Sequence, residues 1–290
     1  MKVTKVVIPV AGWGTRSLPA SKNVPKEMLP IYKKPVVQLV VEEAQAAGLT
    51  DVVFITNQNK TIIEDHFDHN FLLENLLERS GKIEQLEEIR RVSEMVNIIS
   101  VRQKQQLGLG HAVLCAKEVC KNEPFAVMVG DDLMFGLNSG ISQLVEAART
   151  ENMAVIGVIE VPENKVNRYG IIQGEEFAPG MYRVRKLVEK PAIGEAPSRL
   201  AIVGRYVLLP EIFEHLENQK PGVGGEIQLT DALQGLADNN KLLAVKLRGQ
   251  RFDAGDWVEY LTANIYFALH EEDLHDELVK RLQELLPCKG

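Results

Sequence analysis

The chain has 290 residues and a formal net charge of −7 at pH 7, with 45% hydrophobic and 25% charged residues. This composition is typical of a globular protein with a sizeable core, and the acidic balance argues against a binder of nucleic acid. No apolar run approaches the roughly 18 residues of a membrane span, and the N-terminus has no signal-peptide pattern. The three cysteines form no CxxC pair, which favours a reduced, cytoplasmic setting over a disulfide framework or a zinc site.

Short apolar runs alternate with helical patterns in the first half of the chain. Brief, β-branched runs bounded by turn residues predict buried strands at 5–12, 51–57, 125–132 and 154–162. Amphipathic patterns predict helices at 36–48, 109–120 and 140–149, the first closed by Gly48. The alternation predicts an α/β fold with a Rossmann-like, doubly wound sheet, and ligands of such sheets bind beyond the carboxyl ends of the strands.

The remaining segments add a helical insert, further strands and a helical tail. Residues 64–95 carry nine acids against four bases and predict two amphipathic helices broken at Ser80-Gly81. We interpret them as a solvated insert rather than a lid or a subunit contact. Further strands, some antiparallel, are predicted at 168–174, 182–191, 201–210 and 242–249. A helical tail at about 257–286 has a stripe of leucines and is a candidate subunit contact. No linker separates the halves, so residues 1–290 are expected to form one mixed domain.

The first predicted strand runs into a stretch rich in glycine, proline and cations, "PVAGWGTRSLPASKNVPKEMLP" at 9–30. A dinucleotide fingerprint would need glycine at position 17, and a P-loop would need glycine at 17 and lysine at 18. Ser17 and Leu18 exclude both. Between positions 16 and 34 there are five cations and one anion, so the stretch suits a small, highly charged anion. Gly12 and Gly14 let the main chain approach phosphate, and Arg16 and Lys26 supply charge.

This stretch resembles the signature loop of the bacterial sugar-1-phosphate nucleotidylyltransferases. The resemblance continues, in order, through "RQKQQLGLGHAV", "VGDD", "YGII", "VEKP", "GEIQLTD" and "RFDAGD", so that it covers nearly the whole chain. The ending "PKEMLP" and the insert at 64–95 are similar to the branch that uses UTP and glucose 1-phosphate. Thymidylyltransferases usually have a "KQLLP"-like ending and a shorter connection. The resemblance implies a fold of the nucleotide-diphospho-sugar transferase type and a homodimer or homotetramer.

The implied reaction is the attack of a glucose 1-phosphate oxygen on the α-phosphorus of UTP, which expels pyrophosphate and leaves UDP-glucose. Such chemistry depends on positioning and on cations, with no protein nucleophile required. Two alternatives remain open: a thymidylyl- or other sugar-1-phosphate nucleotidylyltransferase, and an inactive regulatory paralogue. A paralogue of that kind tends to lose the cations or the metal-binding aspartates that this chain keeps.

By the same resemblance, Arg16, Lys26 and Asp131 are the expected catalytic residues, and Asp131 and Asp253 are the expected ligands of Mg2+. The alternative interpretation of Asp131 is a helix N-cap, and that of Glu189 and Lys190, outside the resemblance, is a solvated pair. The nucleotide is expected to contact Ala11, Gly12, Gly14, Thr15, Gln103, Gly108 and Gly130. Gln103 matches the residue that reads the uracil edge, although spacing alone does not distinguish it from Gln105 and Gln106. Asp132 and Asp256 are expected to cap a turn and the tail helix.

The half of the chain at about 155–255 is expected to bind the sugar phosphate. The residues that match this role are Gly170, Glu189, Lys190, Gly204, Gly225 and Glu226. Adjacent residues of a strand point to opposite faces, so Glu189 and Lys190 can share a pocket only at a bulge or a strand end, which Pro191 favours. His66, His69 and His111 show no metal-ligand spacing and are read as ordinary surface or core residues.

Overall fold

The computed structural model describes residues 1–136 and 138–285, and within them nine strands form one mixed sheet. In spatial order they are β5 (Asn97–Arg102), β4 (Asp51–Thr56), β1 (Lys5–Pro9), β6 (Phe125–Met128), β11 (Leu200–Leu208), β8 (Ala154–Glu160), β12 (Leu242–Lys246), β10 (Met181–Glu189) and β9 (Gly170–Ala178). Strands β5, β4, β1 and β6 are parallel, whereas β11 runs antiparallel between β6 and β8. The predicted doubly wound mixed sheet is therefore confirmed.

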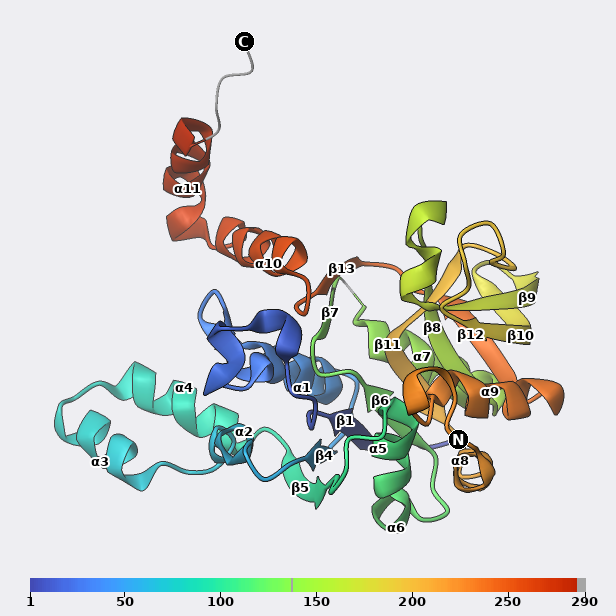
Figure 1. Ribbon diagram of the computed structural model, residues 1–290. Helices are drawn as coiled ribbons and strands as arrows, with labels where there is room; N and C mark the ends of the chain where they lie inside the picture. Colours follow the sequence, from blue (N-terminus) through green and yellow to red (C-terminus); the bar gives the residue numbers. More distant parts are fainter. Residues whose placement is uncertain (137, 286–290) are drawn as a thin grey trace.

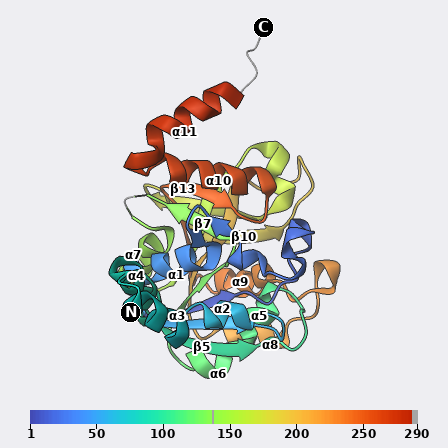
Figure 2. The ribbon, with the colours of Figure 1, turned by 90° about the vertical axis from the view of Figure 1, so that its left-hand side faces the viewer.

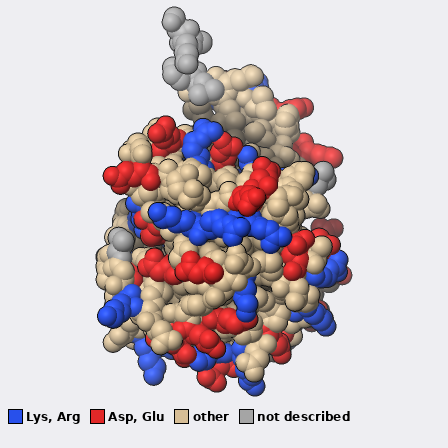
Figure 3. Space-filling model, turned by 90° about the vertical axis from the view of Figure 1, so that its right-hand side faces the viewer, with Lys and Arg blue, Asp and Glu red and all other residues tan. Residues whose placement is uncertain are grey.

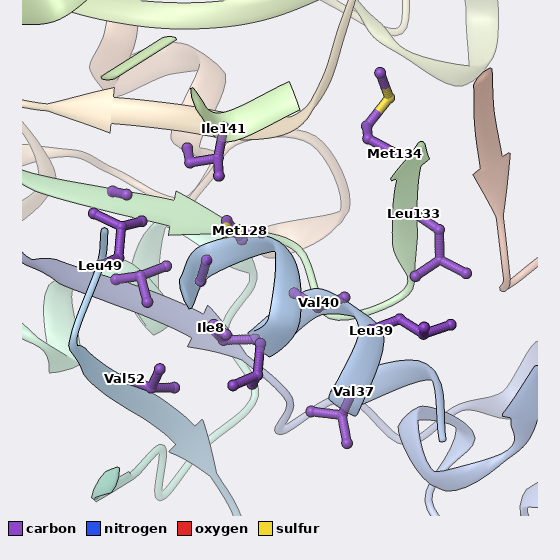
Figure 4. Close-up of a cluster of buried hydrophobic side chains, with 14 of the residues drawn as sticks. Ile8, Val37, Leu39, Val40, Leu49, Val52, Met128, Leu133, Met134 and Ile141 are labelled. Carbon is purple, nitrogen blue, oxygen red and sulfur yellow. The ribbon is translucent and has the colours of Figure 1, made fainter. Parts of the chain in front are cut away.

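Helices cover both faces of the sheet (Figure 1). One face packs against α1 (Val36–Ala46) and α7 (Gly140–Glu151), and the other against α5 (Leu109–Cys115), α8 (Ile212–Asn218) and α9 (Leu229–Asp238). Alternate residues of β1 serve the two cores, because Val6 and Ile8 pack beneath α1 while Val7 packs on the other side. Figure 4 shows Ile8 beside Val40 of α1 and Met128 of β6. Two buried faces explain why these strands are continuously apolar.

Two of the helix predictions can be compared directly with the structure. Helix α1 ends at Ala46, and Gly48 takes a left-handed φ of 78°, as expected of a residue that closes a helix. The single helix predicted at 109–120 is instead divided into α5 and α6 (Lys117–Cys120), with Ala116 between them. Strand β5 and helix α8 were not predicted.

Two small sheets lie beside the large one. Strand β13 (Gln250–Asp253) pairs antiparallel with β7 (Asp132–Phe135), and Asp253 lies opposite Asp132 in this pairing. Strands β2 (Pro30–Ile31) and β3 (Lys34–Pro35) form a short hairpin after the signature loop. The first pairing brings the segment "RFDAGD" to the end of the segment "VGDD", although more than a hundred residues separate them in the sequence.

The insert contains α2 (Thr61–Asp65), α3 (Phe71–Arg79) and α4 (Ile83–Glu94), and its break at Ser80-Gly81 is confirmed by a φ of 70° at Gly81. The tail forms α10 (Trp257–Leu269) and α11 (Glu272–Leu285), with Asp256 capping α10 as expected. Helix α11 projects away from the body of the molecule (Figures 1 and 2). Position 286, the expected end of the tail, and Cys288 lie outside the described residues.

The surface carries both signs of charge. On the face shown in Figure 3, a row of Lys and Arg crosses the middle and is bordered above and below by Asp and Glu. Among the described helices, none has the length and apolar character that a membrane span requires.

Candidate functional site

The signature loop leaves the carboxyl end of β1 and folds back on itself through three short 3-10 turns at 15–17, 20–22 and 26–28. Gly14 has a left-handed φ of 66°, and a Cβ at this position would lie 3.4 Å from the Cβ atoms of both Lys26 and Ser21. The Ser21 hydroxyl donates a hydrogen bond of 2.7 Å to the carbonyl of Gly14. The start and the end of the loop are therefore held together.

Lys26 and Arg16 both face Asp131, which follows β6. Lys26 Nζ donates a hydrogen bond to Asp131 Oδ2, and Arg16 Nη2 lies 3.8 Å from the same oxygen. Burial raises the pKa of Asp131, but Lys26 and Arg16 outweigh it, so the pKa lies below its usual value. Burial likewise lowers the pKa of Lys26, and Asp131 and Glu27 together hold it above its usual value. Both groups are charged at neutral pH.

Asp253, at the end of β13, joins this cluster. A Cβ on Gly255 would lie 2.9 Å from Arg16 Nη2, 2.9 Å from Asp131 Oδ2 and 3.0 Å from Asp253 Oδ1, so these three atoms surround one point. Burial raises the pKa of Asp253, and the nearby carboxylate of Asp131 raises it further. Within residues 1–136 and 138–285 no cluster of three or more metal-ligating side chains occurs. Two converging carboxylates nevertheless suit Mg2+, which takes one or two protein carboxylates together with phosphates and water.

A second ion pair lies directly behind the cluster and was not predicted. Lys60, which follows β4, contacts Glu27 at 2.7 Å, and both side chains are buried. Burial raises the pKa of Glu27 and lowers that of Lys60. The amide of Asn57 donates a hydrogen bond of 2.7 Å to the carbonyl of Ala11. Through these contacts the loop after β4 supports the signature loop from its inner side.

Asp132 does not cap a turn, so that expectation is wrong. Its carboxylate is buried and accepts hydrogen bonds of 2.8 and 3.0 Å from Arg251 and one of 2.9 Å from the backbone of Gly204. Arg205, which is fully buried, binds the carboxylate of Glu43 through two nitrogens and also donates to the carbonyl of Asp132. A buried carboxylate requires such partners, and a turn cap would not supply them.

The predicted base-reading loop follows β5. Gln103 is buried, and its amide nitrogen lies 3.2 Å from the carbonyl of Gly108 and 2.9 Å from Nδ1 of His111. Gly108 has a left-handed φ of 98°, and a Cβ there would come 2.8 Å from Cβ of Glu226. The backbone of Ile227 exchanges hydrogen bonds with that of Leu107 and Gly110. The predicted nucleotide loop and the predicted sugar loop are thus in contact.

The sugar-side pair lies at the end of β10. Lys190 takes a left-handed φ of 45° directly after the strand, and its Nζ lies 3.5 Å from Oε1 of Glu189. The expected strand end, which lets both side chains meet, is confirmed. Glu189 accepts a hydrogen bond of 2.7 Å from Thr230 at the start of α9, and a Cβ on Gly170 would lie 3.1 Å from both of these side chains.

The remaining predicted glycines and Thr15 lie along the same edge of the fold. A Cβ on Gly130 would lie 3.1 Å from Val10 beside β1, and one on Gly204 would lie 2.7 Å from Val129. Both therefore have a packing reason to be glycine, besides any contact with a ligand. Gly225 takes a φ of 76° within a short turn. Gly12 and Thr15 line a hollow of about 590 Å3 that also reaches Lys60.

Comparisons with known proteins show what this chain is similar to in sequence and fold. The model of the family described as nucleotidyl transferase matches residues 5–268. A UTP--glucose-1-phosphate uridylyltransferase 2 of Staphylococcus saprophyticus is 47% identical, and the match covers 98% of each chain. A UTP-bound UGPase from Acinetobacter baumannii is 41% identical with a TM-score of 0.90, covering 98% of this chain and 100% of the other. A UDP-glucose pyrophosphorylase complexed with UDP-glucose is 40% identical with a TM-score of 0.85, covering 92% and 98%.

Proposed function

The chain belongs to the nucleotidyl transferase family, and from that premise we propose that it transfers UMP from UTP to glucose 1-phosphate, releasing pyrophosphate and UDP-glucose. The observation that carries the proposal is the convergence of Arg16, Lys26, Asp131 and Asp253 at one point beyond the carboxyl ends of the strands. The similarity to relatives of that name, over almost the full length of both chains, supports the choice of substrates.

The cations of the loop offset negative charge during the reaction. An oxygen of glucose 1-phosphate attacks the α-phosphorus of UTP, the bond to the β-phosphate oxygen breaks, and pyrophosphate leaves. Negative charge is spread over the phosphoryl oxygens in the transition state. Lys26 and Arg16, which lie close together beside Asp131, stabilise that charge. The backbone from Ala11 to Gly14 lies where it can approach the nucleotide closely.

We propose Mg2+ as the metal that Asp131 and Asp253 bind. The two carboxylates converge, the pKa of Asp253 is raised partly by Asp131, and a cation between them would relieve that repulsion. When bound, Mg2+ contributes positive charge next to the phosphate oxygens. Lys26 forms an ion pair with Asp131 and is a counterion of this carboxylate.

The two ends of the site select the substrates. In this proposal Gln103 and Gly108 read the uracil, Glu189 accepts from glucose hydroxyls and Lys190 meets the sugar phosphate. The contacts of Glu189 support its role, because Thr230 binds Oε2 while Oε1 lies 3.5 Å from Lys190 Nζ, so that an acid and a base stand together. Gly170, Gly204, Gly225 and Glu226 complete the sugar side.

A pyrophosphate-release assay tests the function. Purified protein, glucose 1-phosphate and Mg2+ are incubated in turn with UTP, dTTP, CTP and ATP, and the nucleotide sugar is identified by chromatography. We expect UTP with glucose 1-phosphate to give the highest kcat/KM. A higher value with dTTP would overturn the assignment, and so would a higher value with another sugar phosphate.

We also propose that the chain works in the cytoplasm as a single domain assembled into a homodimer or homotetramer. The two described cysteines are free, and burial raises the pKa of Cys120 to about 12.

Helix α11 is the candidate subunit contact, because it has no buried residue and carries a stripe of leucines that includes Leu274, Leu278 and Leu282. Light scattering of Leu278→Glu tests the role of α11, and we expect a smaller assembly than that of the unaltered chain. An unchanged mass would remove α11 from the interface.

A further inference from the structure

The side chain of Gln103 is held by two contacts that both involve its nitrogen. One partner is the carbonyl oxygen of Gly108 at 3.2 Å, and the other is Nδ1 of His111 at 2.9 Å. A backbone carbonyl can only accept, so it requires the nitrogen end of the amide and excludes the oxygen. The second amide hydrogen then points to the imidazole, and Nδ1 of His111 must accept it.

This contact also determines the protonation state of His111. An imidazole that accepts through Nδ1 is neutral and carries its proton on Nε2. Burial lowers the pKa of His111, which agrees with a neutral ring at pH 7. The carbonyl of Gly108 excludes the opposite orientation of the Gln103 amide, and His111 as an acceptor uses the second amide hydrogen.

The surrounding backbone keeps these partners in register. Gln103 donates its backbone N–H to Thr56 at 2.9 Å, and this bond continues the pairing of β5 with β4. Ile227 binds Leu107 at 2.8 Å and Gly110 at 2.9 Å, on either side of Gly108. His111 lies in the first turn of α5. The amide is therefore oriented by elements that do not depend on a ligand.

We infer that His111 is a positioning residue for base specificity, because it uses the amide nitrogen of Gln103 within the protein and leaves the amide oxygen for the base. This inference rests on the proposed function, in which Gln103 reads the uracil. Uracil carries a hydrogen on N3 and can donate it to that oxygen. Cytosine has a bare lone pair at N3, which would face the oxygen without a hydrogen between them. The oriented amide thus favours uracil over cytosine.

Two substitutions at position 111 separate this role from packing. His111→Leu removes the acceptor, whereas His111→Asn can place Oδ1 close to the position of Nδ1. The ratio of kcat/KM for UTP to that for CTP is measured with glucose 1-phosphate, and binding of each nucleotide is measured by calorimetry. We expect His111→Leu to lower the ratio by about tenfold, mainly through KM, since one of the two hydrogen bonds that orient the amide is lost. We expect His111→Asn to stay within about threefold of the unaltered chain.

A matched control lies elsewhere in the same fold. His66 Nε2 is 3.0 Å from Oε1 of Gln38, and burial also lowers the pKa of this histidine. His66→Leu therefore breaks a similar pair, and we expect it to leave the UTP to CTP ratio unchanged. If His111→Leu does not fold, His111→Phe keeps a ring that lacks the acceptor. An unchanged ratio in the folded variant would overturn the inference, and so would an equal loss in His66→Leu or in His111→Asn.

The inference can fail separately from the proposed function. If the enzyme prefers dTTP, the function is wrong, but thymine has the same hydrogen on N3 and the dTTP to dCTP ratio tests His111 in the same way. If Gln103→Ala keeps the full preference for UTP over CTP, the function stands and the role of His111 falls.

Discussion

Replacement of Arg251 by methionine tests whether the ion pair with Asp132 holds β7 and β13 together, beside the two aspartates that we propose as ligands of Mg2+. Asp132 directly follows Asp131 at the start of β7, and Arg251 lies two residues before Asp253 in β13. The contacts are 2.8 and 3.0 Å, and the exposed fractions of the two side chains are 15% for Arg251 and 7% for Asp132. Burial lowers the pKa of Arg251, but Asp132 outweighs it and raises the pKa further above its usual value.

The expected cost follows from this burial. Arg251→Met removes both hydrogen bonds from Arg251 to the buried carboxylate of Asp132. Of the contacts described above, the hydrogen bond from the backbone N–H of Gly204 remains. Removal of one partner of a buried pair costs about 3–5 kcal/mol. The guanidinium also lies 5.6 Å from the ring centre of Tyr169, and that contact is lost as well. We therefore expect the free energy of unfolding in urea to fall by about 3 kcal/mol or more.

A surface pair provides the control. Arg149 and Glu146 are 2.6 Å apart, but their side chains are 66% and 63% exposed. Arg149→Met should cost less than about 1 kcal/mol. A double variant with Asp132→Asn should lose less than the sum of the single variants, because the two side chains interact directly. A loss for Arg251→Met no larger than that for Arg149→Met would refute the reasoning.

Three further predictions concern the site and the pH dependence of stability. Lys26→Ala should lower kcat by about a thousandfold, while thermal unfolding shows that the fold is intact. Lys33→Ala, at an exposed lysine, is the control and should leave kcat unchanged. Near-normal turnover of Lys26→Ala would remove Lys26 from the mechanism. Asp253→Asn leaves the contact between Lys26 and Asp131 intact and should raise the Mg2+ concentration for half-maximal rate at least about tenfold. An unchanged metal titration would contradict the role of Asp253 as a metal ligand. Burial lowers the pKa of His66 in the folded protein, so the unfolded chain takes up the proton first as the pH falls below about 6.5. The free energy of unfolding should therefore decrease with falling pH, by up to about 1.4 kcal/mol per pH unit. His66→Leu should reduce that slope in urea unfolding between pH 7.5 and 5, and an identical slope would count against this origin.

The central strands could be predicted because their environment leaves a direct trace in the sequence. Strands β1, β4 and β6 are buried on both faces, which requires short runs of β-branched and apolar residues. Strand β5 leaves no such trace, since it lies at the edge of the sheet and its residues are exposed or half-buried. The division of the helix at 109–120 depends on a local turn at Ala116 that no periodicity indicates.

The candidate site likewise contains residues that the sequence singles out and residues that only the fold brings together. Gly14 and Lys26 lie twelve residues apart in one stretch rich in glycine, proline and cations, so the sequence itself singles them out. Lys60 and Glu27, in contrast, are ordinary charged residues until the fold buries them against each other. Lysines and glutamates are mostly exposed in proteins, so the sequence gives no reason to single out this pair. The contact between Glu189 and Lys190 depends on one backbone angle, the left-handed φ of Lys190, which the sequence does not show.

The fold gives different partners to the cations of residues 16–34. Lys34 pairs with Glu42 of α1, and Lys33 pairs with Glu271 near the tail, so these two cations connect elements of the fold. Arg16 and Lys26 instead share Asp131, whose carboxylate offsets their mutual repulsion. The fold thus gathers these two cations around one carboxylate, whereas Lys33 and Lys34 are paired elsewhere. We therefore propose that Arg16 and Lys26, rather than Lys33 and Lys34, offset the charge of a bound triphosphate.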